Sequence, residues 1–217
     1  MRAVPFLLVL AACDSPVTYS GYQMDRYFPF DGQGRTWEFE STDAAVDHRI
    51  VATLDTAFAT HEDGYTRIFS VTYDKDCKAD DGSCTDAWIR DVRWSSDAVE
   101  GVRIWGYETA AGTVSYDPPI VLADPEMLAD EFVTTETGGV TWTATFLGNE
   151  VCPVIWTSEW ADSCIHISLD DGDGNPATGE YLAGDYWAIT QYNVVGMRLT
   201  SDTGTWQLDY ATYIREE

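Results

Sequence analysis

The sequence alternates apolar and polar residues along short runs, and turn-forming residues separate one run from the next. A period of two predicts β-strands, because successive side chains of a strand point to opposite faces of a sheet. In the run YTRIFSVTY, Phe69, Val71 and Tyr73 fall on one face, and Ser70 and Thr72 fall on the other. About ten such runs follow one another, which predicts a mainly β chain.

Short turns between these runs predict antiparallel neighbours. HEDG lies between RIVATLDTAF and YTRIFSVTY, and SDTG precedes the last run, TWQLDYATY. Both turns are typical of hairpins, which join antiparallel strands. At most one or two short helices are expected. The one helical candidate after residue 12 is ADPEMLADEF, where Asp124 would cap the helix and Pro125 would occupy its first turn.

The length of 217 residues suits a single β-rich domain, which we place at residues 27–217. Pro118 and Pro119 suggest a seam, so two halves would meet near residues 118–130. Two runs, YFPFDGQGRTWEFE and TTETGGVTWTATF, both place a glycine-containing turn just before a TW strand. The hypothesis that follows is an internal duplication, and a chance match is its alternative.

The charge is strongly acidic, with 37 Asp and Glu residues against 12 Lys and Arg residues and a formal net charge of -25. Nucleic acid is therefore excluded as a partner class, since phosphates are bound by Lys and Arg. Anionic lipid headgroups are disfavoured for the same reason. The simplest interpretation is a solvated acidic surface, and binding of calcium or of a cationic partner is the alternative.

The amino terminus has the layout of an export signal. Residues 3–12, AVPFLLVLAA, are apolar and follow Arg2, and small residues precede Cys13. The run is too short to span a bilayer, which takes about 20 apolar residues. We therefore assign residues 1–12 to a signal peptide. Residues 13–26 are polar and are expected to form a tether.

The stretch LAAC, Leu10 to Cys13, resembles the lipobox of bacterial lipoproteins. The resemblance implies that the Cys13 thiol receives a diacylglyceryl group, that the chain is cut before Cys13, and that the new amine is acylated with a fatty acid such as palmitate. Two or more acyl chains would anchor the protein stably to a membrane. The alternative is an ordinary signal peptide followed by an incidental cysteine.

The cysteine count is consistent with a lipidated Cys13. Five cysteines are an odd number, and Cys13 on a lipid leaves an even set, namely Cys77, Cys84, Cys152 and Cys164. Pairing of sequence neighbours, Cys77 with Cys84 and Cys152 with Cys164, is one of three possible connectivities. It suits an oxidising compartment. A metal site is the rival interpretation, but the spacing lacks the CxxC pairs and nearby histidines typical of zinc.

Three longer stretches, YFPFDGQGRTWEFE, WADSCIHISLDDGDG and YWAITQYNVVGMRLTSDTGTWQL, resemble uncharacterised envelope lipoproteins. Those proteins often carry a YFPL...G..W.Y opening and a YYAPGVGLV strand before a terminal hairpin. The chain departs from that pattern at Gln191 to Asn193. The resemblance implies a strongly curved antiparallel sheet or partial barrel, and it supplies no assigned activity.

Two acidic loops are candidate metal sites. Asp171, Asp173 and Asn175 alternate in LDDGDGNPATGEY, like the first half of a calcium loop, but Pro176 stands where a sharp turn favours glycine. A weak calcium site is one hypothesis and a plain polar hairpin loop is the other. No cofactor is required by either. The second loop holds a set of aspartates between and around Cys77 and Cys84: Asp74, Asp76, Asp80, Asp81 and Asp86.

Candidate catalytic residues are few, and we expect no enzyme. The three histidines are His48, His61 in a predicted turn, and His166, which alternates with apolar neighbours on a predicted strand. The nucleophile elbow, the zinc-binding helix and the phosphate loops are all missing from the sequence. Three arginines on successive predicted strands are expected to pair with acids such as Asp91 and Glu108 rather than to bind an anion: Arg90, Arg93 and Arg103.

We therefore expect a lipid-anchored protein of the bacterial cell envelope, outside the cytoplasm, with a binding or structural role. A hydrophobic ligand or another envelope component is the expected partner, and such a ligand needs an apolar pocket of at least about 300 Å³. The first alternative is a calcium-assisted glycan-binding module. The second is a hydrolase that uses a pair of carboxylates.

Overall fold

The chain is mainly β, as predicted. The computed structural model describes residues 21–30, 35–41, 48–77, 89–109, 112–153, 163–172, 182–190, 192–200 and 207–212. These residues form 14 strands and one short 3-10 helix, so the strands outnumber the expected ten. The elements are β1 (Tyr22–Gln23), η1 (Met24–Arg26), β2 (Thr36–Ser41), β3 (His48–Thr60), β4 (Arg67–Cys77), β5 (Ile89–Asp97), β6 (Gly101–Thr109), β7 (Gly112–Ala123), β8 (Glu126–Met127), β9 (Phe132–Thr137), β10 (Val140–Glu150), β11 (Cys164–Asp170), β12 (Gly184–Ile189), β13 (Asn193–Thr200) and β14 (Gln207–Thr212).

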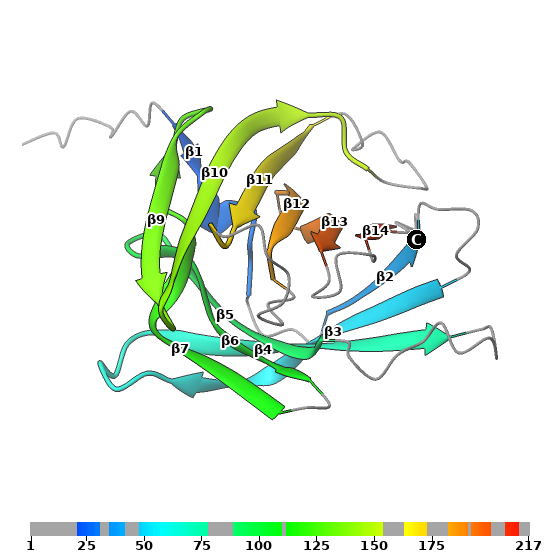
Figure 1. Ribbon diagram of the computed structural model, residues 1–217, viewed down its shortest axis with the longest axis horizontal. Coiled ribbons are helices and arrows are strands. Elements are labelled where there is room, and N and C mark those ends of the chain that lie inside the picture. The colour runs from blue at the N-terminus through cyan, green and yellow to red at the C-terminus, as the bar shows by residue number, and fades with distance from the viewer. Residues whose placement is uncertain are drawn as a thin grey trace, which may run out of the picture.

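Twelve of the strands form one curved antiparallel sheet, in the order β7-β6-β5-β4-β3-β2-β14-β13-β12-β11-β10-β9. Figure 1 shows the curvature, which brings the first edge strand, β7, near the last, β9. The backbone N–H of Val121 in β7 donates to Oγ1 of Thr135 in β9 at 3.0 Å. The curved antiparallel sheet expected from the sequence is therefore confirmed.

The curvature is associated with breaks in the register of neighbouring strands. Such breaks occur between Leu54 and Phe58 of β3, between Ile104 and Gly106 of β6, and between Phe146 and Gly148 of β10. A β-bulge bends its strand and increases the local twist. Gly106 is needed at its bulge, because a side chain there would collide with the carbonyl oxygen of Val114.

The two prolines predicted to mark a seam lie inside β7. In the pairing of β6 with β7, Gly106 faces Ser115 and Ile104 faces Ile120, so Pro118 and Pro119 fall where the register shifts. Proline has no N–H to donate to a ladder and is tolerated at such a break. In the order of the sheet, strands β2 to β7 lie on one side and strands β9 to β14 on the other. The chain crosses from the first group to the second just after β7.

The helix predicted from ADPEMLADEF does not form. Its residues Glu126 and Met127 are β8, which pairs antiparallel with Gln23 and Tyr22 of β1 in a separate two-stranded sheet. The N–H of Met24 also donates to the carbonyl oxygen of Pro125 at 3.0 Å. The capping signals were local, and a strand partner from the far amino-terminal segment outweighed them.

The folded domain also begins earlier than residue 27, which corrects the predicted tether of residues 13–26 over residues 21–26, while residues 13–20 lie outside the described residues. Residues 22–26 form β1 and η1, and Met24 is completely buried. Phe28, only four residues further on, is buried as well. The segment from Gly21 to Arg26 therefore belongs to the fold.

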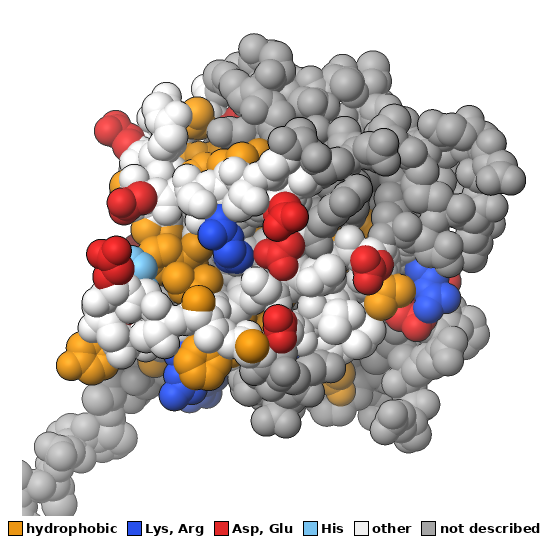
Figure 2. Space-filling model, turned by 90° about the horizontal axis from the view of Figure 1, so that it is seen from below, with side chains coloured by type: hydrophobic (Ala, Val, Ile, Leu, Met, Phe, Trp, Pro, Cys, Tyr) orange, Lys and Arg blue, Asp and Glu red, His pale blue; other side chains and the backbone are white. Residues whose placement is uncertain are grey.

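The outer face of the sheet carries the dispersed acidic charge. Figure 2 shows the molecule from below, and in its described part red carboxylate side chains lie among white and orange surface, with fewer blue side chains than red ones. This distribution agrees with the solvated acidic surface expected from the composition.

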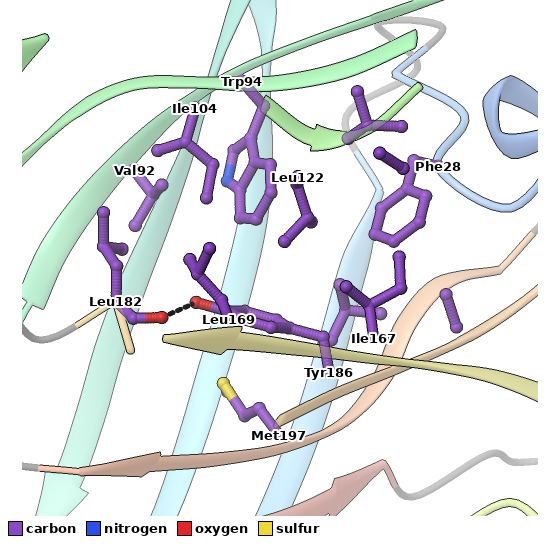
Figure 3. Packing of buried hydrophobic residues seen from close by; sticks show 14 of the residues in the cluster. Phe28, Val92, Trp94, Ile104, Leu122, Ile167, Leu169, Leu182, Tyr186 and Met197 are labelled. Carbon is purple, nitrogen blue, oxygen red and sulfur yellow. Dashed lines mark hydrogen bonds between the residues drawn. The ribbon is translucent and has the colours of Figure 1, made fainter. Parts of the chain in front are cut away.

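The concave face of the sheet encloses one hydrophobic core that both halves of the chain build. Figure 3 shows Trp94 of β5 facing Tyr186 of β12, with Leu122 and Phe28 nearby. The rings of Trp94 and Tyr186 meet edge to face with centroids 6.2 Å apart, and Trp94 stacks on Phe30 at 5.8 Å. The hydroxyl of Tyr186 is satisfied, since it donates to the carbonyl oxygen of Leu182 at 2.5 Å.

We predict that Met24→Ala destabilises the protein, because it would leave a cavity in this core. The free energy of unfolding in urea should fall by about 2–5 kcal/mol. Arg26→Ala is the matched control, since Arg26 is exposed two residues away and its loss should change the value by less than about 0.5 kcal/mol. Equal stability of the two variants would show that residues 21–26 are not part of the folded domain.

Candidate functional site

His166 lies between two carboxylates on the outer face of the sheet. As predicted, it alternates along β11 with Ile165 and Ile167, which are buried on the inner face. Its Nδ1 is 3.2 Å from Oε1 of Glu150, and its Nε2 is 3.1 Å from Oδ1 of Asp185. Only 13% of its side chain is exposed. Both ring nitrogens are therefore engaged by acids.

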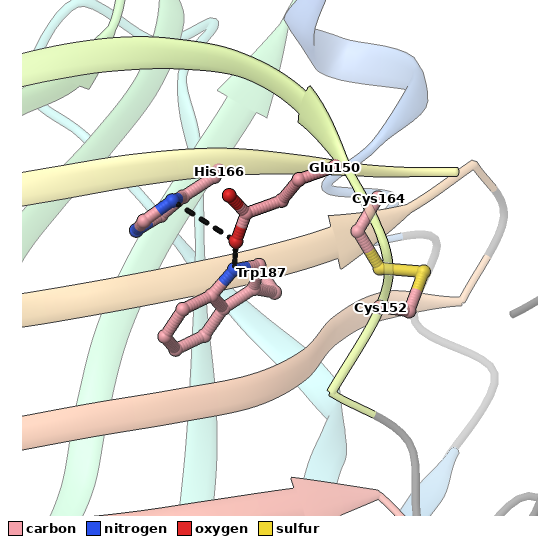
Figure 4. Close-up of a disulfide and its surroundings, with 5 residues drawn as sticks. All are labelled: Glu150, Cys152, Cys164, His166 and Trp187. Atoms are coloured by element: carbon pink, nitrogen blue, oxygen red, sulfur yellow. Dashed lines mark hydrogen bonds and ion pairs between the residues drawn. A yellow bond between two sulfur atoms is a disulfide. The ribbon is translucent and has the colours of Figure 1, made fainter. Parts of the chain in front are cut away.

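Aromatic contacts complete this histidine cluster, which we define as Glu150, His166, Asp185, Trp187 and Arg198. The imidazole stacks on the indole of Trp187 with centroids 4.5 Å apart and planes 23° from parallel. Trp187 Nε1 donates to the same oxygen of Glu150 that His166 contacts (Figure 4). The Arg198 guanidinium lies 5.7 Å from the indole centroid, a cation–π contact.

Strand register positions these side chains. His166 of β11 faces Trp187 of β12, and Asp185 of β12 faces Arg198 of β13. Residues two apart on one strand share a face, so Asp185 and Trp187 both reach the outer side. Glu150 comes from the end of β10, beyond the bulge at Gly148. The cluster thus spans four neighbouring strands.

The disulfide beside the cluster agrees with the predicted pairing of Cys152 with Cys164. Their Cα atoms are 4.9 Å apart (Figure 4). The two cysteines belong to a second, small hydrophobic cluster with Trp187, Ile189 and Val195. The disulfide ties the end of β10 to the start of β11. Cys13, Cys84 and the side chain of Cys77 lie outside the described residues.

The contacts within the histidine cluster shift the pKa values of His166 and Asp185 in opposite directions. Burial by itself would lower the pKa of His166, but the hydrogen bond to Asp185 and the charges of Glu150 and Asp185 outweigh it and raise the pKa. The hydrogen bond from His166 lowers the pKa of Asp185 despite partial burial. An imidazolium between two carboxylates is therefore favoured. Such a histidine links the strands that carry Glu150 and Asp185, since each of its ring nitrogens contacts one carboxylate.

The predicted calcium site is only partly within the described residues. Asp171 is buried, whereas Asp173 and Asn175 lie outside them. Asp170 uses its Oδ1 to accept the N–H of Gly172 at 3.0 Å, a local turn contact. In the second acidic loop, Asp74 is exposed, and the side chains of the other four aspartates are not described. Among the described residues, no three acidic, histidine or cysteine side chains are grouped to hold a metal ion.

The direct contacts of Arg93 and Arg103 are with groups other than the expected acids, although the charge of Arg93 acts to lower the pKa of Asp91. Arg93 donates to the carbonyl oxygen of Val114 at 2.7 Å, and Arg103 pairs with Glu100 at 2.8 Å. Asp91 and Glu108 instead face each other across β5 and β6. Burial, and next the charge of Glu108, raise the pKa of Asp91. The side chain of Arg90 is not described. Arg93 and Arg103 therefore have separate structural partners.

Of the remaining histidines, only His61 has a described side chain, and its contacts with Trp105 and Asp63 are separate from the histidine cluster. His61 lies in the predicted turn between β3 and β4, where its ring contacts that of Trp105 in a tilted arrangement with centroids 4.5 Å apart. The turn itself is organised by Asp63, whose Oδ1 accepts the N–H of Tyr65 at 2.7 Å. His48 begins β3, and its side chain lies outside the described residues.

Two hollows open within the described core, and they share Tyr73 and Trp94. Each has a cavity volume of about 10 Å³, which is roughly the space for one water molecule. Both are lined mainly by apolar side chains, and Asn193 is the polar exception in one of them. These two hollows are by themselves far smaller than the roughly 300 Å³ that a hydrophobic ligand would need.

The sequence patterns identified His166 as a strand residue but missed its partners Glu150, Asp185 and Trp187. The alternation in GDYWAI places Asp185 and Trp187 on one face, which is the one local signal that was available. Which residue of β11 they meet depends on strand register, which a local pattern does not give.

Comparison with protein-family models, with curated proteins and with solved structures found no match to this chain. In the described part of the chain, no helix has the length and apolar character that crossing a membrane requires.

We predict that the pairing of His166 with Asp185 stabilises the protein only over a limited range of pH. The folded pKa of His166 lies above its ordinary value of 6.5, so its contribution is full below pH 6.5 and is lost as the pH rises through the folded pKa. The folded pKa of Asp185 lies below 3.8, so its contribution is lost only as the pH falls through that lower value.

A double-mutant cycle of His166→Gln and Asp185→Asn measures this pairing from free energies of unfolding in urea. The coupling energy should be about 1 kcal/mol between pH 3.8 and 6.5 and should shrink as the pH is raised further. The two single variants are the internal controls of the cycle. A coupling energy that stayed constant into the alkaline range would contradict the charged pair.

Proposed function

We propose that this chain is a lipid-anchored protein of the bacterial cell envelope that binds or supports other envelope components outside the cytoplasm. The observation that carries the proposal is the disulfide between Cys152 and Cys164. Disulfides of this structural kind persist in oxidising compartments and are rare in the cytosol. An exported chain is the simplest setting for one.

The same disulfide makes the assignment of Cys13 more specific. With Cys152 and Cys164 paired, three cysteines remain, and pairing Cys77 with Cys84 leaves Cys13 alone. That last cysteine follows an apolar run and two alanines, as a lipobox would require. Two or more acyl chains on one residue hold a protein stably at a membrane.

A binding or supporting role is favoured over catalysis by the state of His166. Both of its ring nitrogens contact carboxylates, and the cluster lies outside the two described hollows. A general base must instead keep a nitrogen within reach of a substrate. This arrangement of His166 therefore does not support the hydrolase alternative. The calcium-assisted glycan alternative rests on Asp171, Asp173 and Asn175, of which only the first is described.

We expect Cys13→Ala to abolish incorporation of labelled palmitate and to release the protein from the membrane fraction, since the variant lacks the thiol that carries the lipid. Cys84→Ala is the matched control, because it removes a different cysteine and should keep both the label and the membrane association. Continued labelling of the Cys13→Ala protein would refute the proposal.

A further inference from the structure

Three apolar side chains are exposed on one small region of the surface. The exposed fractions are 46% for Leu128, 67% for Phe132 and 45% for Leu147. Large apolar residues exposed singly are common, but a group of them marks an interaction surface. We call these three residues the apolar patch.

The backbone pairing places the three residues together. Phe132 of β9 faces Thr145 of β10, and the chain before it continues alongside β10. There the N–H of Phe146 donates to the carbonyl oxygen of Glu131 at 2.9 Å. The N–H of Glu131 in turn donates to the carbonyl oxygen of Leu128 at 3.1 Å. Leu147 follows Phe146 directly on β10, so it lies beside the segment that carries Leu128 and Phe132.

The patch adjoins the point at which the amino-terminal segment joins the domain. Tyr22 of β1 packs edge to face on Phe146 with centroids 5.1 Å apart, and its hydroxyl accepts a hydrogen bond from Asn149 at 2.9 Å. β1 pairs with β8, which ends at Met127, immediately before Leu128. Figure 1 shows β1 beside β9 and β10 at the upper left.

The distance from Cys13 to this point is short. Eight residues separate Cys13 from Tyr22, so even a fully extended chain spans only about 30 Å. A lipid on Cys13 would therefore hold the patch within a few nanometres of the bilayer. Tethering of this kind raises the effective concentration of the membrane surface, so a weak insertion becomes significant.

The charges around the patch specify the kind of membrane surface. Two neighbouring carboxylates are occupied locally, since Glu126 accepts the N–H of Gly21 at 2.6 Å and Glu131 accepts the N–H of Leu128 at 2.7 Å. Asp130 is exposed, and the whole chain has a formal net charge of -25. Anionic headgroups would be repelled, so a neutral, zwitterionic surface is the one that fits.

We propose that Leu128, Phe132 and Leu147 insert into the interfacial region of a zwitterionic bilayer and orient the domain on the membrane to which Cys13 anchors it. This inference rests on the proposed lipidation of Cys13. Apolar side chains that penetrate the headgroup boundary add to the hold of a lipid chain and fix which face of the protein meets the membrane.

The test is photo-cross-linking of the lipidated full-length protein in phosphatidylcholine vesicles. A benzophenone amino acid replaces Phe132 in one sample and Tyr65 in a matched one. Tyr65 is 89% exposed, and its turn joins β3 to β4 at the lower left of Figure 1, away from β1. We expect cross-links to lipid to be several-fold more frequent from position 132, and to decrease there in a Leu128→Asp and Leu147→Asp background.

Palmitate labelling of the same samples separates the two proposals. A labelled protein that forms no more lipid cross-links from position 132 than from position 65 would overturn the patch and leave the lipidation intact. Cross-links from position 132 to residues 14–20 or to a second copy would also overturn it, because another occupant would then cover the patch. A protein without label would overturn both proposals.

Discussion

The fold depends on one constraint, namely that a long antiparallel sheet must bury one whole face. Twelve strands are too many to be covered by one short helix, so the sheet curves until its own strands cover each other. Trp94 of β5 then meets Tyr186 of β12, although nearly a hundred residues separate them. The register breaks supply the bends, and the hydrogen bond from Val121 to Thr135 joins the two edge strands.

Curvature also explains why the outer face needs its own stabilisation. Side chains on the convex side diverge, and the strands from β10 to β13 are held there by the disulfide and the histidine cluster. In a chain with few basic residues, His166 lies where the carboxylates of Glu150 and Asp185 come close, and its raised pKa favours the charged imidazolium there. Partial burial of His166 reduces screening of this pairing by solvent, but it also disfavours the charged imidazole, and the two carboxylates outweigh that cost.

Local sequence patterns correctly predicted the structural features that depend on residues close together in the sequence. The period of two identified the strand faces, so Phe69 and Val71 are buried as expected, and the spacing of Cys152 and Cys164 favoured their disulfide. Contacts between distant segments were missed. The pairing of β1 with β8 turned a predicted helix into a strand and drew residues 21–26 into the fold. Glu150 and Asp185 reach His166 through strand register, which a single sequence does not specify.

Both halves of the chain share one core, and we therefore expect them to unfold together. Hydrogen–deuterium exchange at increasing urea concentration, read on the peptides that contain β5 and β12, tests it most directly. One shared core predicts that both peptides lose protection at the same urea midpoint. Loss of protection in one peptide at a clearly lower midpoint, with the other still folded, would show two independent units and would contradict the claim.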